Sequence, residues 1–164
     1  MDERMVVKDA LSVELILLNF NEIRRRSSLL WHQVPEPFYH WRPDAKAMSC
    51  IEMIRHVLEG EFLYHDIIKN KGVSSIKSPW DDLKYESVTE ELDFAEPYRS
   101  DFIKTIRSYS EHDLKTIEIV RKDKNQRRSL GDYLMRIAYH EAVHTGQLLA
   151  YLRTLGMERP MIWD

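Results

Sequence analysis

Residues 129–156 read SLGDYLMRIAYHEAVHTGQLLAYLRTLG, and this stretch predicts one long amphipathic helix. Ser129 is a typical N-cap residue, Asp132 places an acid in the first turn, and Gly156 follows the end. Residues spaced three and four apart share one face of such a helix. That face consists of Leu130, Leu134, Ile137, Glu141, His144, Leu148 and Leu152. We therefore expect a helix over about 130–155 that packs this face against other helices.

Two earlier segments have the same periodicity. The first spans about 7–30 and contains the basic triplet 24–26, which is interpreted as a solvated face. The second spans about 46–70, with Asp44 as its predicted N-cap, and follows the proline-rich segment 32–43 that ends the first helix. The predicted apolar stripe of the first helix is Leu11, Leu15, Leu18, Glu22, Leu29 and Leu30, and Ile16 and Ile23 widen it.

Residues 73–99 are the least regular part of the chain, because Pro79, Pro97 and scattered serines interrupt any period. A connection of this length is uncommon within a compact domain and indicates a lid or a crossover between helices. A third helix is predicted over about 98–110, followed by a short helical turn at 111–114.

The segment before the last helix is polar and basic. Residues 116–120 are rich in β-branched side chains and are predicted to be extended, and 121–128 is predicted to be a solvated loop with a turn at Lys124 and Asn125. The tail after the last helix ends with Trp163, which is expected to pack back on the protein. Four long helices in one small chain predict an all-α fold, a four-helix bundle.

Composition limits the class of protein. With 164 residues, 43% of them hydrophobic and 31% charged, the chain is expected to form a single domain over 1–164. A net charge of −3 offers no excess of cations for nucleic acid, and one cysteine excludes a disulfide-stapled fold. The sequence has no secretory signal and no bilayer-spanning apolar run. We therefore expect a cytoplasmic protein with no nucleic-acid or membrane partner.

Three histidines form the candidate site. His140 and His144 lie four residues apart, about 40° from each other on one helix face, a spacing that lets two imidazoles bind one metal ion. His56 is the best third ligand, because it lies near the middle of the second helix, at about the height of the other two. Three neutral imidazoles leave coordination positions open for water or substrate, as in catalytic metal sites. The alternative interpretation is a hydrogen-bonded polar layer in the core.

Several polar side chains lie on the same helices. Glu52 and Glu59 share a helix face with His56, and Glu141 and Gln147 lie beside the pair on the last helix. Each is a candidate to orient a histidine, to act as a fourth ligand or to act as a general base. The alternative is that they are ordinary polar residues of helices.

The remaining candidates are predicted to lie outside the site. His65 is nine residues from His56, about 180° around the helix. Cys50 lies about 240° from His56 and is interpreted as a partly buried thiol. Three further histidines are expected mainly at the surface: His32, His40 and His112.

The sequence resembles the DinB-like (YfiT-type) damage-inducible family of metal-binding four-helix bundles. The resemblance depends on YHEAVHTGQ at 139–147, the following LLAYLR at 148–153 and the ending RPMIW at 159–163. WRP at 41–43 and the helix that carries Ser49 and His56 also match. The family pattern implies His56, His140 and His144 as ligands of nickel, zinc, iron or manganese. It also implies an up-down-down-up topology, which suits the long connection, and frequently a homodimer.

The resemblance leaves three functions open. In the first, the protein is a metal-dependent enzyme in which the metal activates a thiol or water. Some family members are similar to thiol S-transferases that use bacillithiol or mycothiol, and a hydrolase-like reaction is a further variant. In the second, it is a non-catalytic stress-response or binding protein with a structural or vestigial metal site. In the third, it is an interaction module that dimerises through a bundle face.

Overall fold

The computed structural model describes the backbone of residues 3–163 and the side chains of residues 12–163, so the predicted stripe position Leu11 lies outside the described side chains. No helix in this part of the chain is long and apolar enough to span a membrane. The long helices are α1 (Glu3–Trp31), α2 (Cys50–Asn70), α3 (Val88–Arg107) and α5 (Leu130–Thr154). The shorter elements are the 3₁₀ turns η1 (Glu36–Phe38) and η2 (Lys122–Lys124), the helix α4 (Glu111–Thr116), and the strands β1 (Glu118–Arg121) and β2 (Gln126–Ser129).

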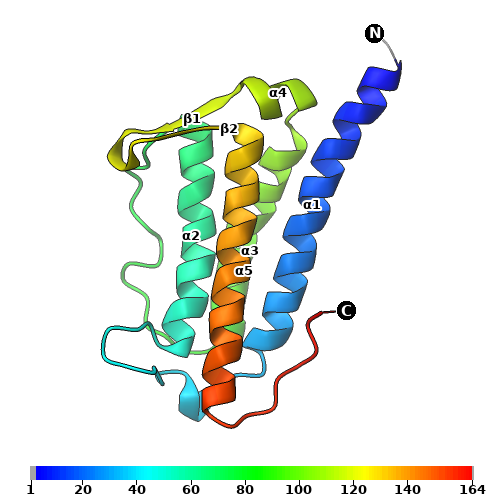
Figure 1. The fold of residues 1–164 in the computed structure, drawn as a ribbon. Coiled ribbons are helices and arrows are strands. Elements are labelled where there is room, and N and C mark those ends of the chain that lie inside the picture. The colour runs from blue at the N-terminus through cyan, green and yellow to red at the C-terminus, as the bar shows by residue number, and fades with distance from the viewer. Residues whose placement is uncertain (1–2, 164) are drawn as a thin grey trace.

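The four long helices form a bundle, and Figure 1 shows that α1 and α5 run in one direction while α2 and α3 run in the other. This is the up-down-down-up topology that the resemblance implies. The connection 71–87 returns the chain along the bundle between the parallel helices α2 and α3 (Figure 1). Its start is held by a hydrogen bond from the Val120 amide to the Lys71 carbonyl. Farther along, Arg55 donates to the carbonyls of Leu83 and Lys84 at 2.6 and 2.7 Å.

The hydrophobic core consists of two clusters. One is centred on Phe20, Phe102 and Tyr133, near the end of the bundle that carries the β1–β2 hairpin. The other is centred on Trp31 and Ile54, near the opposite end. Each of the four long helices contributes buried charged or hydroxyl side chains at a level between the two clusters. These residues are Arg24, Ser27, Glu61, Arg99, Glu141 and Thr145. The bundle therefore contains a polar layer between two apolar layers.

The predicted buried face of the first helix is wrong in part, because Leu30 is buried as expected but most of the predicted stripe is not. Leu15 and Leu18 are 56% and 57% exposed, and the helix buries instead a face that includes Leu17, Phe20 and Arg24. The helix carries apolar residues on most of its circumference, so periodicity alone does not select the face that packs. Arg24, interpreted as part of a solvated triplet, is only 8% exposed.

The starts of two helices also differ from the prediction. α2 begins after Ser49, which forms a capping box with Glu52, and not at Asp44, whose carboxylate caps only the local turn at Lys46. α3 begins after Ser87, about ten residues earlier than expected, and continues through Pro97. A proline removes one backbone hydrogen bond from a helix interior. The burial of Ala95 and Arg99 on both sides of Pro97 offsets this loss through packing.

The polar segment before α5 is more ordered than a solvated loop. β1 confirms the extended conformation expected around 116–120, but β2 was not predicted, and the two strands pair in antiparallel register from Glu118 with Ser129 to Arg121 with Gln126. Asn125 adopts a left-handed conformation at the turn, with φ of 49°. α4 confirms the short helical turn, and Ser129 caps α5 as predicted. Trp163 does not pack back, because it is 81% exposed and its neighbour Ile162 is buried instead.

Candidate metal centre

Three imidazole rings converge between α2 and α5. The Nε2 atom of His140 lies 3.1 Å from the Nε2 atom of His56 and 3.1 Å from that of His144. One ring nitrogen from each histidine lies within 4.8 Å of the other two. His56 comes from the second turn of α2, while His140 and His144 lie one turn apart on α5. The structure therefore brings together the three histidines that the sequence predicts as ligands.

The donor set fits a divalent transition metal. An ion bound to nitrogen at about 2.1 Å holds neighbouring nitrogens about 3.0–3.4 Å apart, depending on its geometry. The two measured separations of 3.1 Å fall within this range. Three imidazole nitrogens suit zinc, copper, iron and nickel better than calcium or magnesium, which prefer oxygen ligands.

For His140 and His56 the surroundings favour the neutral form that metal binding requires. Burial, together with the neighbouring His144 and His56, lowers the pKa of His140 to about 4. Burial and His144 also lower the pKa of His56, although Glu59 acts in the opposite direction. Neutral rings keep an Nε2 lone pair available at pH 7.

Gln147 orients one of the ligands. Its Oε1 atom lies 2.7 Å from Nδ1 of His144, so Nδ1 donates and the lone pair of the ring lies on Nε2. This partner selects the tautomer whose free nitrogen faces the other two rings. Gln147 therefore has the position of an orienting residue, one of the roles that the sequence predicts for it.

A pocket of about 260 Å³ adjoins the histidines. The His140 ring lies at the wall of this pocket, next to Gly60, where a Cβ atom would be in van der Waals contact with Cε1 of His140 at 3.4 Å. The ring of Tyr64 contacts the His140 ring edge to face, with centroids 5.5 Å apart. The residues lining this pocket are His56, Glu59, Gly60, Leu63, Tyr64, Ile67, Arg121, Lys124, Gln126, Arg136 and His140.

The three candidate carboxylates lie in different places. Glu59 lines the pocket beside His56. Glu52 closes the capping box of α2 by accepting from the Ser49 amide at 2.7 Å, and it pairs with Arg42 at 3.1 Å. Glu141 points into the polar layer of the bundle interior. Of the three carboxylates, Glu59 is the one that lines the pocket.

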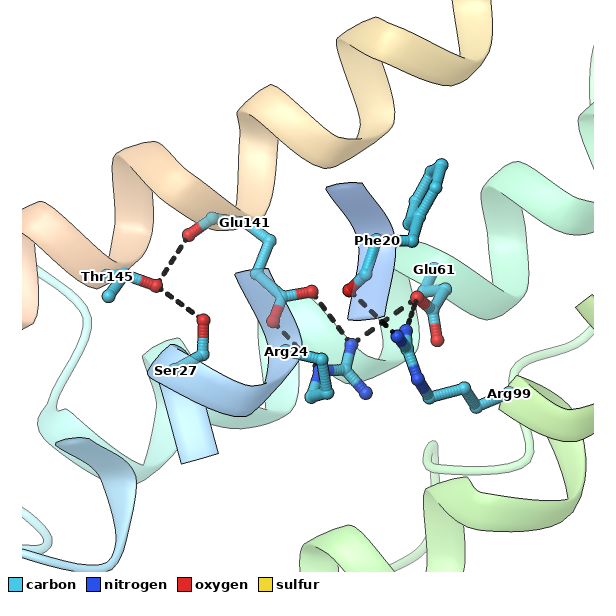
Figure 2. Close-up of polar contacts among 7 residues, drawn as sticks. All are labelled: Phe20, Arg24, Ser27, Glu61, Arg99, Glu141 and Thr145. Atoms are coloured by element: carbon cyan, nitrogen blue, oxygen red, sulfur yellow. Dashed lines mark hydrogen bonds and ion pairs between the residues drawn. The ribbon is translucent and has the colours of Figure 1, made fainter. Parts of the chain in front are cut away.

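Glu141 belongs to a buried charge network, which Figure 2 shows. Both of its carboxylate oxygens accept from Arg24, at 2.8 and 2.9 Å. Arg24 also approaches Glu61 at 3.4 Å, and Glu61 accepts from Arg99 at 2.5 Å. Burial raises the pKa of Glu141, but the nearby Arg24 guanidinium outweighs it and keeps the pKa below its usual value.

The bundle thus has a polar core layer, but it is formed by these charged residues and not by the histidines. It contains two arginines and two glutamates, so its formal charges balance. Ser27 and Thr145 extend it with a hydroxyl contact of 2.8 Å (Figure 2). Sequence reasoning missed Arg24, Glu61 and Arg99 as members. The sequence feature that could have identified them is that each of the other three long helices carries a charged residue at the height of Glu141 in the bundle.

The other candidates lie outside the centre. His65 is buried on α2 and contacts Oγ1 of Thr105 at 2.8 Å, which confirms that it does not share the site. Cys50 is fully buried, and burial raises the pKa of its thiol to about 11, so it is unreactive at neutral pH. His32 and His112 are exposed, as predicted.

The comparisons with known proteins agree on one family. The pattern of the DinB superfamily matches residues 19–148 of the chain. The uncharacterized protein YjoA of Bacillus subtilis (strain 168) is 25% identical over 142 residues, which cover 86% of this chain and 89% of that protein. The crystal structure of this DinB-like protein, YjoA, superposes with a TM-score of 0.68 at 23% identity, over 90% of this chain and 96% of that chain. At this identity the structural likeness shows a shared fold alone.

Proposed function

The chain belongs to the DinB superfamily, and from this premise we propose that it is a divalent-metal protein whose ion is held by His56, His140 and His144. The observation that carries the proposal is the approach of the three Nε2 atoms, with two separations of 3.1 Å. A proton on Nε2 of His140 would form a hydrogen bond with one of the two neighbouring ring nitrogens, whereas a shared cation accounts for both contacts of 3.1 Å. The four buried charges of the polar layer pair with one another, so the core does not need the histidines as partners.

We propose further that the centre is catalytic. A bound divalent cation lowers the pKa of a coordinated thiol or water, which makes it a nucleophile at neutral pH. The three protein ligands leave coordination positions open, and the pocket beside them is lined by residues of α2, α5 and the β1–η2–β2 hairpin. The reaction class is thiol S-transfer or hydrolysis of a small molecule. Glu59, one turn from His56, is positioned to accept the proton of the incoming nucleophile.

Metal analysis tests the binding proposal. The protein as purified is expected to hold one equivalent of nickel, zinc, iron or manganese, and the His140→Ala/His144→Ala variant is expected to hold none. His112→Ala, which removes an exposed histidine of α4, is the matched control and retains the metal. Equal occupancy in all three proteins would refute the proposed centre.

A second experiment separates the enzyme from a non-catalytic metal protein. Metal-loaded protein is assayed with low-molecular-weight thiols, such as bacillithiol and mycothiol, against electrophiles, and with hydrolysable esters and amides. Turnover that Glu59→Gln lowers by about 10²–10⁴-fold, with metal content unchanged, supports the assigned base. A loaded protein inert toward every pair favours a binding or stress-response role.

We also propose a cytoplasmic homodimer. Large apolar side chains are exposed on neighbouring helices, with Leu15 and Leu18 on α1 and Met135 and Tyr139 on α5. A groove of about 290 Å³ lies between the same two helices and is bordered by Trp163 of the tail. A second copy of the chain that covers this face would remove these side chains from water.

A further inference from the structure

The pocket beside the histidines has charged groups distributed along its length. Glu59 lies on α2 one turn from His56, at the metal end. Arg121 and Lys124 belong to the β1–η2–β2 segment, which lies at the end of the bundle (Figure 1). Arg136 lies one turn before His140 on α5, toward the same hairpin. The pocket is therefore acidic near the metal centre and basic at the hairpin end.

Arg136 is held in place by aromatic rings and not by an acid. Its guanidinium lies 5.6 Å from the ring centroid of Tyr64 and 5.8 Å from that of Tyr133. Among the side chains of residues 12–163 no carboxylate forms an ion pair with it. Arginines that lie against aromatic faces keep their N–H donors in a fixed plane and available to a ligand. The charge of Arg136 thus faces the pocket without a protein counter-ion.

Arg121 has a different role. It binds Asp123 through two hydrogen bonds of 2.8 and 2.5 Å and donates to the Tyr133 hydroxyl at 3.2 Å. These contacts attach the hairpin to α5, next to the ring on which Arg136 lies. Lys124, at the exposed tip, has no carboxylate partner in the described part of the chain and adds a second available cation.

We propose that this end of the pocket binds a carboxylate or phosphate group of the substrate, and that Arg136 is its main ligand, with Lys124 assisting. The inference rests on the proposed metal centre and narrows the substrate to a small anion. Arg136 and His140 are four residues apart on one face of α5 and line the same pocket, so the anionic group is bound beside the centre, on its hairpin side. Arginine recognises carboxylate and phosphate through paired N–H donors, so this position selects anionic over neutral substrates.

A titration of metal-free protein tests the anion site independently of the metal. Inorganic phosphate and glutarate are titrated separately, and the amide NMR spectrum is recorded. Saturable shifts are expected in the hairpin and in residues 131–140, and the anion that gives them identifies phosphate or carboxylate as the recognised group. Arg136→Gln is expected to weaken this binding about 10-fold. Arg153→Gln removes the same charge from the last turn of α5 and is expected to bind as the parent protein does.

The site is refuted if neither anion gives saturable shifts, or if Arg136→Gln and Arg153→Gln behave alike. Either result leaves metal binding untouched, because no metal is present in this experiment. Conversely, saturable anion binding by a protein that takes up no metal would refute the proposed function and leave the anion site.

A second titration tests whether the anion site serves the metal centre. Co²⁺-loaded protein is titrated with mercaptopropionate and with mercaptoethanol, and thiolate coordination is followed by absorption. Arg136→Gln is expected to weaken mercaptopropionate about 10-fold and to leave mercaptoethanol unchanged, while Arg153→Gln changes neither. The two thiols differ in thiol pKa, but each thiol is compared only with itself across the protein variants, so this difference does not affect the result. An equal effect of Arg136→Gln on both thiols would refute the assignment of Arg136 as the substrate's anion ligand.

Discussion

Gln147 determines which nitrogen of His144 faces the candidate centre, and its effect is testable at the level of one residue. Gln147→Leu removes the acceptor for Nδ1–H, so the ring loses its preferred tautomer, and metal affinity is expected to fall about 10–100-fold. Gln147→Glu retains an acceptor at the same place and is expected to keep the affinity of the parent protein or exceed it. Competition with a chelator measures both. Equal affinities for Gln147→Leu and the parent protein would contradict the orienting role.

His65 makes the stability of the protein depend on pH. Burial and Lys69 lower its pKa from 6.5 to about 4, against the opposite effect of Asp101 and Asp66. Between about pH 6.5 and 4 the unfolded chain therefore binds a proton that the folded chain does not, and the free energy of unfolding decreases as the pH falls. The decrease from this residue is at most about 3 kcal/mol, spread over that interval.

The measurement is denaturant unfolding of the parent protein and of His65→Gln at several pH values. An amide at this position can still bond Thr105 but cannot titrate, so the difference in unfolding free energy between the two proteins is expected to shrink as the pH falls from 6.5 to 4. Since the other histidines titrate equally in both proteins, they cancel. A difference that stays constant with pH would show that His65 is not the titrating group.

At the scale of elements, the buried network links all four long helices through Arg24, Glu61, Arg99 and Glu141. Glu141→Gln leaves the buried Arg24 with Glu61 alone, which Arg99 also binds, and the free energy of unfolding is expected to fall by about 3 kcal/mol. Metal affinity is expected to stay unchanged, because the Glu141 carboxylate faces Arg24 and not the centre. The double variant Arg24→Met/Glu141→Met should recover most of the loss, since no unpaired charge remains. Metal loss in Glu141→Gln with unchanged stability would instead place Glu141 at the centre.

A second prediction at the scale of elements concerns the residue that caps the start of α2. Ser49→Ala removes the capping box and is expected to lower the free energy of unfolding by about 1 kcal/mol. Asp44→Ala removes only the cap of an exposed turn, so its effect is expected to be a few tenths of a kcal/mol. Thermal unfolding of the two variants ranks them. The opposite order would favour Asp44 as the true N-cap.

At the scale of the whole molecule, the exposed apolar face of α1 and α5 predicts self-association. The parent protein is expected to sediment as a dimer, and Leu18→Glu to sediment as a monomer, because a buried carboxylate at the interface would be unpaired. Leu83→Glu, a matched change at an exposed leucine of the 71–87 connection, should remain dimeric. A parent protein that sediments as a monomer would contradict the proposed homodimer.

Much of this molecule follows from local patterns. Ser129 before a period of three and four residues specifies α5, because capping and amphipathicity are properties of neighbouring residues. The same spacing places His140 and His144 on one face, and the height of His56 on its helix predicts the third ring. The up-down-down-up order came from family resemblance and not from periodicity.

Other features depended on contacts between distant segments. α1 is apolar on several sides, and only packing against α5 and α3 selects the face of Leu17 and Phe20 over that of Leu15 and Leu18. α3 continues through Pro97 because the packing of buried residues on both sides of the proline offsets the backbone hydrogen bond that it removes. Arg24 and Glu141 are 117 positions apart, and no local pattern pairs two residues that far apart. Helix formation depends on neighbouring residues and can therefore be predicted from the sequence. Which faces are buried and which charges pair depends on the free energy of the whole packed bundle, so only the tertiary structure decides them.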